Sequence, residues 1–222
     1  MIHQISPLDG RYANSIAELS KYFSESTLMR YRLKVEIEYL IAMGKEKGIK
    51  ELLPFSKNEQ SHLRKIYENF NSAGGEKVKE IEATTNHDVK AIEYYIQGKV
   101  EKALHPWIHF ALTSEDVNNL SYSLMWQDGL KQVYLPMLLS LNKELKKLAR
   151  KHKNRSMLTL THGQPATPTT FGKELAVIYS RLDRQISQSK VHKLLGKFGG
   201  ATGTWSAQIV AYPKVNISEE RR

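Results

Sequence analysis

The chain has 222 residues, of which 41% are hydrophobic and 25% charged, and this composition is typical of a folded globular protein. Its 13 glycines and 7 prolines exclude collagen-like and low-complexity character. The lack of cysteine excludes disulfides, thiolate metal sites and a cysteine nucleophile. The apolar stretches are far shorter than the roughly 20 residues of a membrane span, so we expect a cytoplasmic protein without a membrane partner.

The excess of positive charge favours anionic partners. The 33 Lys and Arg residues against 23 Asp and Glu give a net charge of +10. Such a charge suits nucleic acid, an acidic membrane surface, or a phosphorylated or polycarboxylate metabolite. The densest basic run lies between Lys143 and Arg155, and leucines from Leu138 to Leu148 alternate with it at helical spacing. We therefore interpret the run as the solvated side of an amphipathic helix and predict no nucleic-acid partner.

Helical periodicity recurs along most of the chain and predicts an all-α fold. Ser24 is expected to start a helix that runs to about Lys47. The sequence from Ser56 to Glu59 matches a capping box, which predicts a second helix to about Asn71.

The next segment is predicted to hold two shorter helices. Gly74-Gly75 is typical of a break, and helices are expected at 76–83 and 88–104, with Asn86 as a cap between them. We place a soft domain boundary after residue 105, so that 1–105 form an N-terminal helical domain.

Residues 106–222 are predicted to begin a bundle of long helices. One helical pattern runs from Thr113 to about Lys151 with only Pro136 to interrupt it, and a second runs from Thr167 to about Leu195. Because helices of this length bury their apolar stripes against other long helices, we expect a bundle that other subunits complete.

Two polar segments in the first half are candidates for chemistry. In Ser6–Tyr12, Arg11 can form a bidentate contact with a phosphate and Tyr12 can donate its hydroxyl, although the segment also fits an ordinary turn. In Thr84–Asp88, His87 would sit at the first turn of a helix, where anions bind and where an imidazole can carry a proton. A plain cap with an exposed histidine is the alternative.

The segment Thr113–Asn119 offers a third candidate. The hydroxyls of Thr113 and Ser114, with the free N–H groups of a helix start, can hold a carboxylate. A capping box between Thr113 and Asp116 explains the same residues structurally.

The fourth candidate is Thr159–Pro168. Gly163 permits unusual backbone angles, the two prolines force their preceding residues to be extended, and Thr167-Pro168 reads as a cap followed by a first-position proline. His162 would then lie on a stiff loop between two long helices, as a general acid or base requires. A buried structural histidine is the alternative.

Two further patterns are weak. Gly196–Gly203 is rich in glycine, but it lacks the lysine-serine ending of a P-loop and follows no strand, so nucleotide binding by that mechanism is not expected. His105 and His109 have metal-ligand spacing without an apparent third ligand, and we predict no metal.

Five segments in order carry a resemblance to a known family: SPLDGRY, TTNHDVKAIEYY, IHFALTSEDVNNLSYSLM, THGQPATPTTFGKE and GKFGGATG. Together they closely resemble the adenylosuccinate lyase family of the fumarase/aspartase superfamily, over essentially the whole chain. The resemblance implies elimination of fumarate from adenylosuccinate, giving AMP, and from the succinylcarboxamide imidazole ribotide of purine synthesis. It also implies that no cofactor is used and that a homotetramer builds each active site from several subunits.

The resemblance assigns roles to matching positions. His162 resembles the general acid, and His87 the second histidine that supports it. The positions that it implies for substrate binding are Arg11, Tyr12, Asn86, Asp88, Thr113, Ser114, Thr161 and Gln164. Among these, Arg11 and Tyr12 resemble a nucleotide-binding pair, and Asp88 is also expected to orient His87. Lys90 and Asn119 are weaker candidates.

One departure from the family bears on activity. Family chains are longer, and their mobile loop of the GSSxMPxKxN type, which carries the serine base, has no counterpart in these residues. We therefore expect an N-terminal portion of such a lyase that is inactive alone. The alternative is a catalytically silent helical module that binds nucleotides or assembles with a partner.

Overall fold

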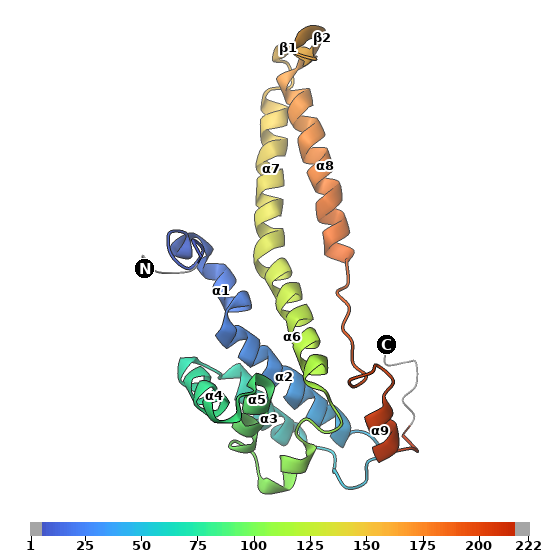
Figure 1. Ribbon diagram of the computed structural model, residues 1–222. Helices are drawn as coiled ribbons and strands as arrows, with labels where there is room; N and C mark the ends of the chain where they lie inside the picture. The colour runs from blue at the N-terminus through green and yellow to red at the C-terminus, as the bar shows by residue number, and fades with distance from the viewer. Residues whose placement is uncertain (1–5, 216–222) are drawn as a thin grey trace. The chain divides into compact units, whose positions relative to one another are not determined.

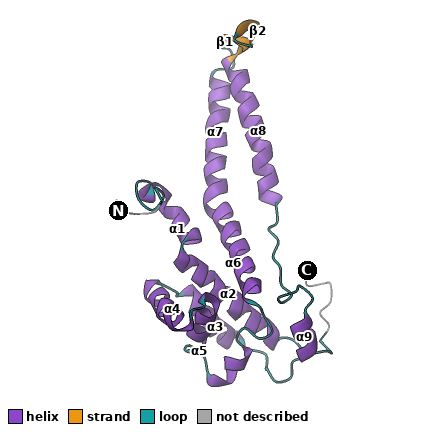
Figure 2. Ribbon diagram, in the orientation of Figure 1, coloured by secondary structure: helices purple, strands orange, loops and turns teal. Residues whose placement is uncertain are grey.

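The computed structural model describes residues 6–215, which are predominantly α-helical with one two-stranded antiparallel sheet (Figures 1 and 2). This confirms the expected fold class. The chain divides into two compact units, one formed by residues up to Trp126 together with those from Leu195 onward, and the other by Gln127–Leu194. The domain boundary expected after residue 105 is a different division and stays a prediction. Within the described range, no helix is both long and apolar enough to cross a bilayer.

The first unit is built around α2 (Glu25–Gly44), whose side chains supply much of its hydrophobic core, with Leu33, Ile37, Leu40 and Ile41 almost fully buried. The other elements of this unit follow in chain order: η1 (Ala13–Ile16), α1 (Ala17–Phe23), α3 (Lys57–Glu68), α4 (Ser72–Thr85), α5 (Asp88–Gln97), η2 (Lys102–Trp107), most of α6 (Ser114–Gly129) and α9 (Ser206–Ala211). Residues that contact the sides of α2 therefore come from distant parts of the sequence.

Two predicted helix starts are confirmed. The Ser24 hydroxyl accepts the N–H of Thr27 and caps α2. Ser56 and Glu59 form both bonds of a capping box at the start of α3. These are local interactions, which explains why the sequence predicted them.

The predicted break at Gly74-Gly75 is wrong. Asn71 accepts the N–H of Gly74 and starts α4 before the glycines. Gly75 is buried, and a Cβ built on it would come within 3.8 Å of the Ser26 hydroxyl and 4.0 Å of Met29. These are ordinary van der Waals distances, so Gly75 lies on the face of α4 that packs against α2, without a steric requirement for glycine.

The predicted cap between the two shorter helices is confirmed, whereas the end of the second helix needs correction. Asn86, with φ of 50°, is the C-cap of α4, and His87 is the N-cap of α5. The predicted helix 88–104 ends at Gln97, because the chain turns through Gly98 into the separate 3-10 helix η2.

The second unit is a helical hairpin. The end of α6 continues through the π-helical turn η3 (Leu130–Tyr134) into α7 (Leu135–Lys151), so the predicted helical path is confirmed with one irregular turn. Pro136 lies in the first turn of α7. Its ring cannot donate a hydrogen bond and would crowd a regular preceding turn, and the wider π turn accommodates it.

Residues predicted as a loop between the long helices form a β-hairpin, β1 (Ser156–Thr161) and β2 (Gln164–Thr170), before α8 (Phe171–Val191). The predicted cap at Thr167-Pro168 is wrong, because both residues belong to β2 and Thr170 caps α8 through the N–H of Lys173. The helix also ends at Val191 rather than near Leu195.

The helices α7 and α8 pack closely. The Asn142 amide donates to Asp183 at 3.0 Å, and Ala149, Gly172 and Ile186 are buried. The leucines that the sequence predicted on one apolar stripe are not all buried: Leu141 is 52% exposed and Leu148 is 40% exposed. The second unit by itself leaves apolar surface uncovered.

Candidate functional site

The His87 side chain begins α5. Its Nδ1 accepts the backbone N–H of Lys90 at 3.2 Å, so the imidazole itself caps the helix. A neutral imidazole that accepts at Nδ1 carries its proton on Nε2. The side chain is 50% exposed. His87 is therefore fixed through one nitrogen and offers the other to a ligand. The residue is thus a helix cap with an exposed ring, and the same ring remains able to bind a ligand.

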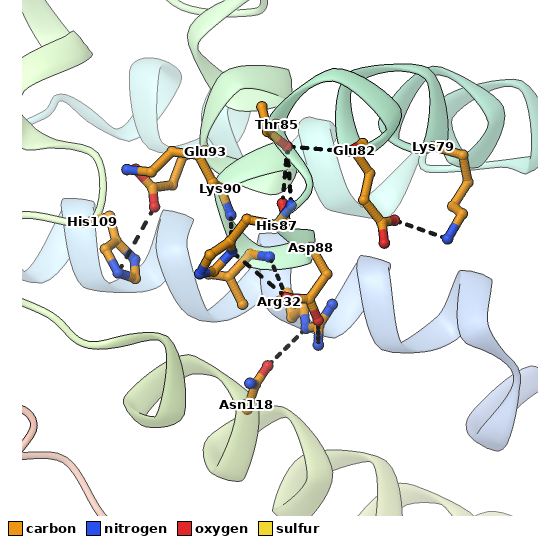
Figure 3. Close-up of polar contacts among 11 residues, drawn as sticks. Arg32, Lys79, Glu82, Thr85, His87, Asp88, Lys90, Glu93, His109 and Asn118 are labelled. Atoms are coloured by element: carbon orange, nitrogen blue, oxygen red, sulfur yellow. Dashed lines mark hydrogen bonds and ion pairs between the residues drawn. The ribbon is translucent and has the colours of Figure 1, made fainter.

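Asp88 is directed to Arg32 rather than to His87 (Figure 3). Its Oδ2 accepts from the Arg32 guanidinium at 2.5 Å and its Oδ1 accepts the Val89 N–H at 2.8 Å, whereas His87 Nδ1 lies 3.7 Å from Oδ1. Partial burial opposes ionisation, but the Arg32 charge and the backbone bond outweigh it and lower the pKa of Asp88. Asp88 is thus a stable carboxylate that anchors the start of α5.

Arg32 joins two of the candidate segments. Its Nε donates to the Asn118 side chain at 2.9 Å, while a terminal nitrogen binds Asp88. Arg32 is only 6% exposed and belongs to α2. The starts of α5 and α6 are consequently tied to the same buried guanidinium.

Asp116 is completely buried next to Thr113 and Ser114. Its carboxylate accepts the backbone N–H groups of Thr113, Gly199 and Gly200 at 3.0 to 3.1 Å and the ammonium of Lys197 at 2.9 Å. Burial opposes ionisation, but these donors outweigh it and lower the pKa of Asp116.

The glycine-rich segment therefore binds a carboxylate of the protein itself. Asn119 adds two bonds to the backbone of Lys197, donating to its carbonyl at 2.8 Å and accepting its N–H at 2.6 Å. Half of the predicted capping box at Thr113 is present, from the Thr113 N–H to Asp116. Within residues 6–215, the hydroxyls of Thr113 and Ser114 make no hydrogen bond, which leaves them available to a ligand.

His162 lies at the tip of the β-hairpin in the second unit. His162 and Gly163 have φ of 49° and 74°, as the two central residues of a type I′ turn require. Thr161 pairs with Gln164 on either side of them, and all four residues are exposed. The alternative of a buried histidine is thereby excluded for this chain. Across the described part of the chain, His162 has no hydrogen bond or ion pair that would occupy its imidazole.

Arg11 and Tyr12 occupy the predicted turn near the N-terminus. The Tyr12 N–H donates to Pro7 at 3.0 Å, and the Arg11 guanidinium lies 5.5 Å from the centre of the Tyr12 ring. Both side chains are exposed. No hydrogen bond or ion pair among the residues that the structure describes links this pair to His87 or Thr113.

Sequence reasoning missed a buried charge cluster beside α5 (Figure 3). The Glu36 carboxylate accepts two hydrogen bonds from His109, one from its Nδ1 at 2.6 Å and one from its backbone N–H at 3.1 Å. On the other side, His109 Nε2 lies 3.8 Å from Glu93, which binds Lys90 at 2.6 Å. Burial opposes protonation of His109, but the Glu36 bond and charge outweigh it and raise its pKa. Glu36 and His109 are distant in sequence, so no local pattern could reveal them.

An apolar cavity of about 280 Å³ in the described part of the first unit lies beside the glycine-rich segment. Aromatic side chains line much of it: Tyr39, Phe110, Phe198, Trp205 and Tyr212. It contains none of the predicted site residues. Among residues 6–215, no three His, Asp or Glu side chains are arranged to hold a metal ion.

The candidate residues are thus divided between the two units. The first holds the starts of α5 and α6, with Arg11 and Tyr12, and the second holds Thr161, His162 and Gln164. Within the first unit, Arg32 brings the His87 and Thr113 segments into one bonded network.

A family model described as "Lyase" matches residues 10–220. The chain therefore belongs to this lyase family, consistent with its helical fold and with the ionisable and hydroxyl side chains at its helix starts.

Within this lyase family, the chain is similar to curated adenylosuccinate lyases. The chain is 43% identical to an adenylosuccinate lyase of Haemophilus influenzae and 41% identical to that of Escherichia coli, in each case over 97% of this chain and 49% of the relative. An adenylosuccinate lyase of Dictyostelium discoideum is 44% identical over 96% of this chain and 47% of its own length. The chain spans about half the length of the curated relatives it matches.

Solved structures agree on the fold. A fumarate lyase from Mesorhizobium superposes with a TM-score of 0.70 at 21% identity, covering 89% of this chain and 45% of its own. A 3-carboxy-cis,cis-muconate lactonizing enzyme from Pseudomonas putida gives 0.67 at 22% identity, covering 89% and 44%. At such identities the likeness concerns the fold alone.

Proposed function

We propose that the protein acts as an adenylosuccinate lyase, eliminating fumarate from adenylosuccinate to give AMP and from the succinylcarboxamide imidazole ribotide. The observation that carries the proposal is identity of 41% to 44% with adenylosuccinate lyases over nearly the entire chain. The net charge of +10 suits these polyanionic substrates.

In the proposed reaction, a base removes a proton from the succinyl carbon next to a carboxylate. The electron pair forms the carbon–carbon double bond of fumarate as the carbon–nitrogen bond breaks, and an acid protonates the departing nitrogen. His162 is proposed as that acid, supported by its exposed imidazole on a tight turn. The base is assigned to the serine of a GSSxMPxKxN segment, which these 222 residues do not contain. The chain alone is therefore proposed to be inactive.

The other residues are proposed to hold the substrate. Thr113 and Ser114 suit a succinyl carboxylate, because their hydroxyls and the free N–H groups of α6 can donate to it. Arg11 and Tyr12 suit the nucleotide phosphate, and His87 offers one ring nitrogen to the substrate. Asn86, Asp88, Thr161 and Gln164 complete the proposed set.

Assembly into a homotetramer is part of the proposal. In the second unit, exposed apolar side chains on α7 and α8 support further helix packing: Met137 is 67% exposed, and Leu141 and Ile178 are each 52% exposed. Residues of the two units could then meet between different copies. A cytoplasmic location stays a prediction.

The second candidate is a catalytically silent module that binds purine nucleotides or assembles with a partner. A natural polypeptide without such a serine segment would favour it. The deciding experiment measures the intact mass of the natural polypeptide and its release of fumarate from adenylosuccinate by absorbance. Turnover that requires His162 supports the lyase. AMP binding without turnover, by a natural polypeptide of 25.5 kDa, favours the silent module.

A further inference from the structure

We infer that Arg32, Glu36 and Tyr39 are positioning residues of the proposed lyase site. They form a polar stripe on α2, and the stripe fixes the segments that carry His87, Thr113 and Ser114. This inference rests on the proposed function for its catalytic consequence, whereas the contacts themselves do not depend on it.

The spacing of these residues places them on one side of the helix. Positions 32, 36 and 39 are separated by four and three residues, which is the spacing of neighbours along a helix face. Arg32 is 6% exposed and Glu36 is 2% exposed. The polar stripe thus places two buried charges on the helix that supplies the apolar core.

Each member of the stripe binds a residue in or next to a candidate segment. Arg32 bridges Asp88, which follows His87, and Asn118 in the first turns of α6. Glu36 holds His109 through both its ring and its backbone N–H.

Tyr39 continues the stripe by one turn. Its hydroxyl donates to the Phe110 carbonyl at 3.0 Å. The segment that enters α6 therefore has two anchors on α2, at His109 and Phe110, shortly before Thr113.

The backbone from His109 to the start of α6 has a conformation that these hydrogen bonds stabilise. His109 and Ala111 have φ of 58° and 57°, a left-handed conformation that costs residues with a Cβ about 1 kcal/mol or more each. The two bonds from Glu36 and the one from Tyr39 can offset this cost. Without them the segment is free to relax, and the hydroxyls of Thr113 and Ser114 would move with it.

A purely structural role would favour apolar contacts instead. Removing an arginine and a glutamate from water is costly, and well-packed apolar residues often replace such groups without loss of stability. Directional bonds to Asp88, Asn118 and His109 fix position as well as proximity. Position is what a site needs, since a displacement of about 1 Å can cost on the order of 100-fold in rate.

The test compares Glu36→Gln with the matched control Glu38→Gln in the natural polypeptide. Glu38 lies on the same helix but pairs with Arg64 at 2.7 Å, away from the candidate segments. Glu36→Gln should lower kcat/KM for adenylosuccinate by about 10- to 100-fold, whereas Glu38→Gln should stay within about 2-fold. Tyr39→Phe, which removes one oxygen, should lower kcat/KM several-fold and provides the readout if Glu36→Gln does not fold.

A second readout follows the geometry itself. In the polypeptide labelled with ¹⁵N-histidine, Glu36→Gln should shift the His109 Nδ1 resonance and leave the ring resonances of His87 unchanged. Amide exchange over residues 108–116 should become faster in Glu36→Gln and in Tyr39→Phe but not in Glu38→Gln. A structural role without a positioning role would change these signals while kcat/KM remained within about 2-fold of wild type, and that result would overturn the inference.

The two proposals fail in different ways. If the wild-type polypeptide releases no fumarate, the proposed function fails, and the resonance and exchange measurements still decide whether Glu36 and Tyr39 position the segment. Unchanged His109 signals and unchanged exchange in both variants would overturn the inference whatever the wild-type activity.

Discussion

The ammonium of Lys197 lies 2.9 Å from the carboxylate of Asp116, a completely buried residue 81 positions earlier in the chain. The same lysine also donates to the carbonyl of Gly200. This pair brings a lysine from the glycine-rich segment next to the start of α6, beside Thr113 and Ser114. The segment that resembles a phosphate-binding loop in composition thus closes on a carboxylate of its own chain.

Replacement of Asp116 by Asn should destabilise the first unit strongly. An amide keeps one acceptor oxygen but presents two N–H donors to surrounding N–H groups and to Lys197, so buried donors lose their partner. The expected loss is about 3 kcal/mol in the free energy of unfolding, measured by urea titration. The exposed neighbour Glu115 provides the control, and Glu115→Gln should change stability by less than about 0.5 kcal/mol. Equal effects of the two changes would contradict the role given to Asp116.

The contribution of Asp116 should depend on pH with a defined sign. Its pKa is lowered in the folded state, so its stabilisation is present above the unfolded value of about 3.9 and is lost as the pH falls through the folded value. The stability difference between wild type and Asp116→Asn should therefore be full at pH 7 and narrow below about pH 4. Urea unfolding of both proteins from pH 7 to pH 3 measures it. A difference that stays constant over this range would show that the carboxylate charge does not contribute.

His162→Ala should abolish fumarate release in any polypeptide that has this activity, while substrate binding is largely retained. The side chain is exposed at a hairpin tip, so its removal should leave the fold intact. The loss should be of order 100- to 10,000-fold in kcat, as expected for general acid catalysis, and binding can be followed by calorimetry. His192→Ala, at the end of α8, is a control that should retain turnover. Near-normal turnover of His162→Ala would remove His162 from the acid role.

Gly172→Ala should destabilise the helical hairpin. A Cβ at this buried position would collide with the Ala149 carbonyl in α7 and lie 2.6 Å from backbone atoms of Lys153, in the turn that follows α7. Overpacking of this kind costs typically 1 to 3 kcal/mol, measured by thermal or urea unfolding. Gly98→Ala is the control, because its Cβ would have ordinary contacts of 3.6 Å and longer, and it should be close to neutral. A neutral Gly172→Ala would mean that the helices can separate at no cost.

Local signals in the sequence predicted much of the secondary structure. The caps at Ser24 and Ser56 span only three or four residues, and the extended backbone before Pro165 and Pro168 follows from each proline ring. Predictions failed where packing overrides propensity. Gly74-Gly75 lies inside α4 because Asn71 caps the helix before the glycines and Gly75 is buried against α2. The residues predicted as a loop form a hairpin because β1 pairs with β2.

The candidate residues at helix starts could also be found from sequence, since histidine, threonine and serine next to turn signals are recognisable locally. The residues that hold these segments in place could not be found in this way. Glu36 reads as one more polar residue of a helix, and its partner His109 lies 73 positions away. Arg32 similarly meets Asn118 across 86 positions.

The sequence by itself therefore determined the helical class, the caps and the chemical groups offered to a substrate, because these depend on neighbours within a turn or two. Only the tertiary structure decided which charges are buried, what they bind and how the starts of α5 and α6 are fixed. A buried charge is stable only beside its partner, and the partners of Arg32, Glu36 and Asp116 are supplied by the folding of distant segments onto one another.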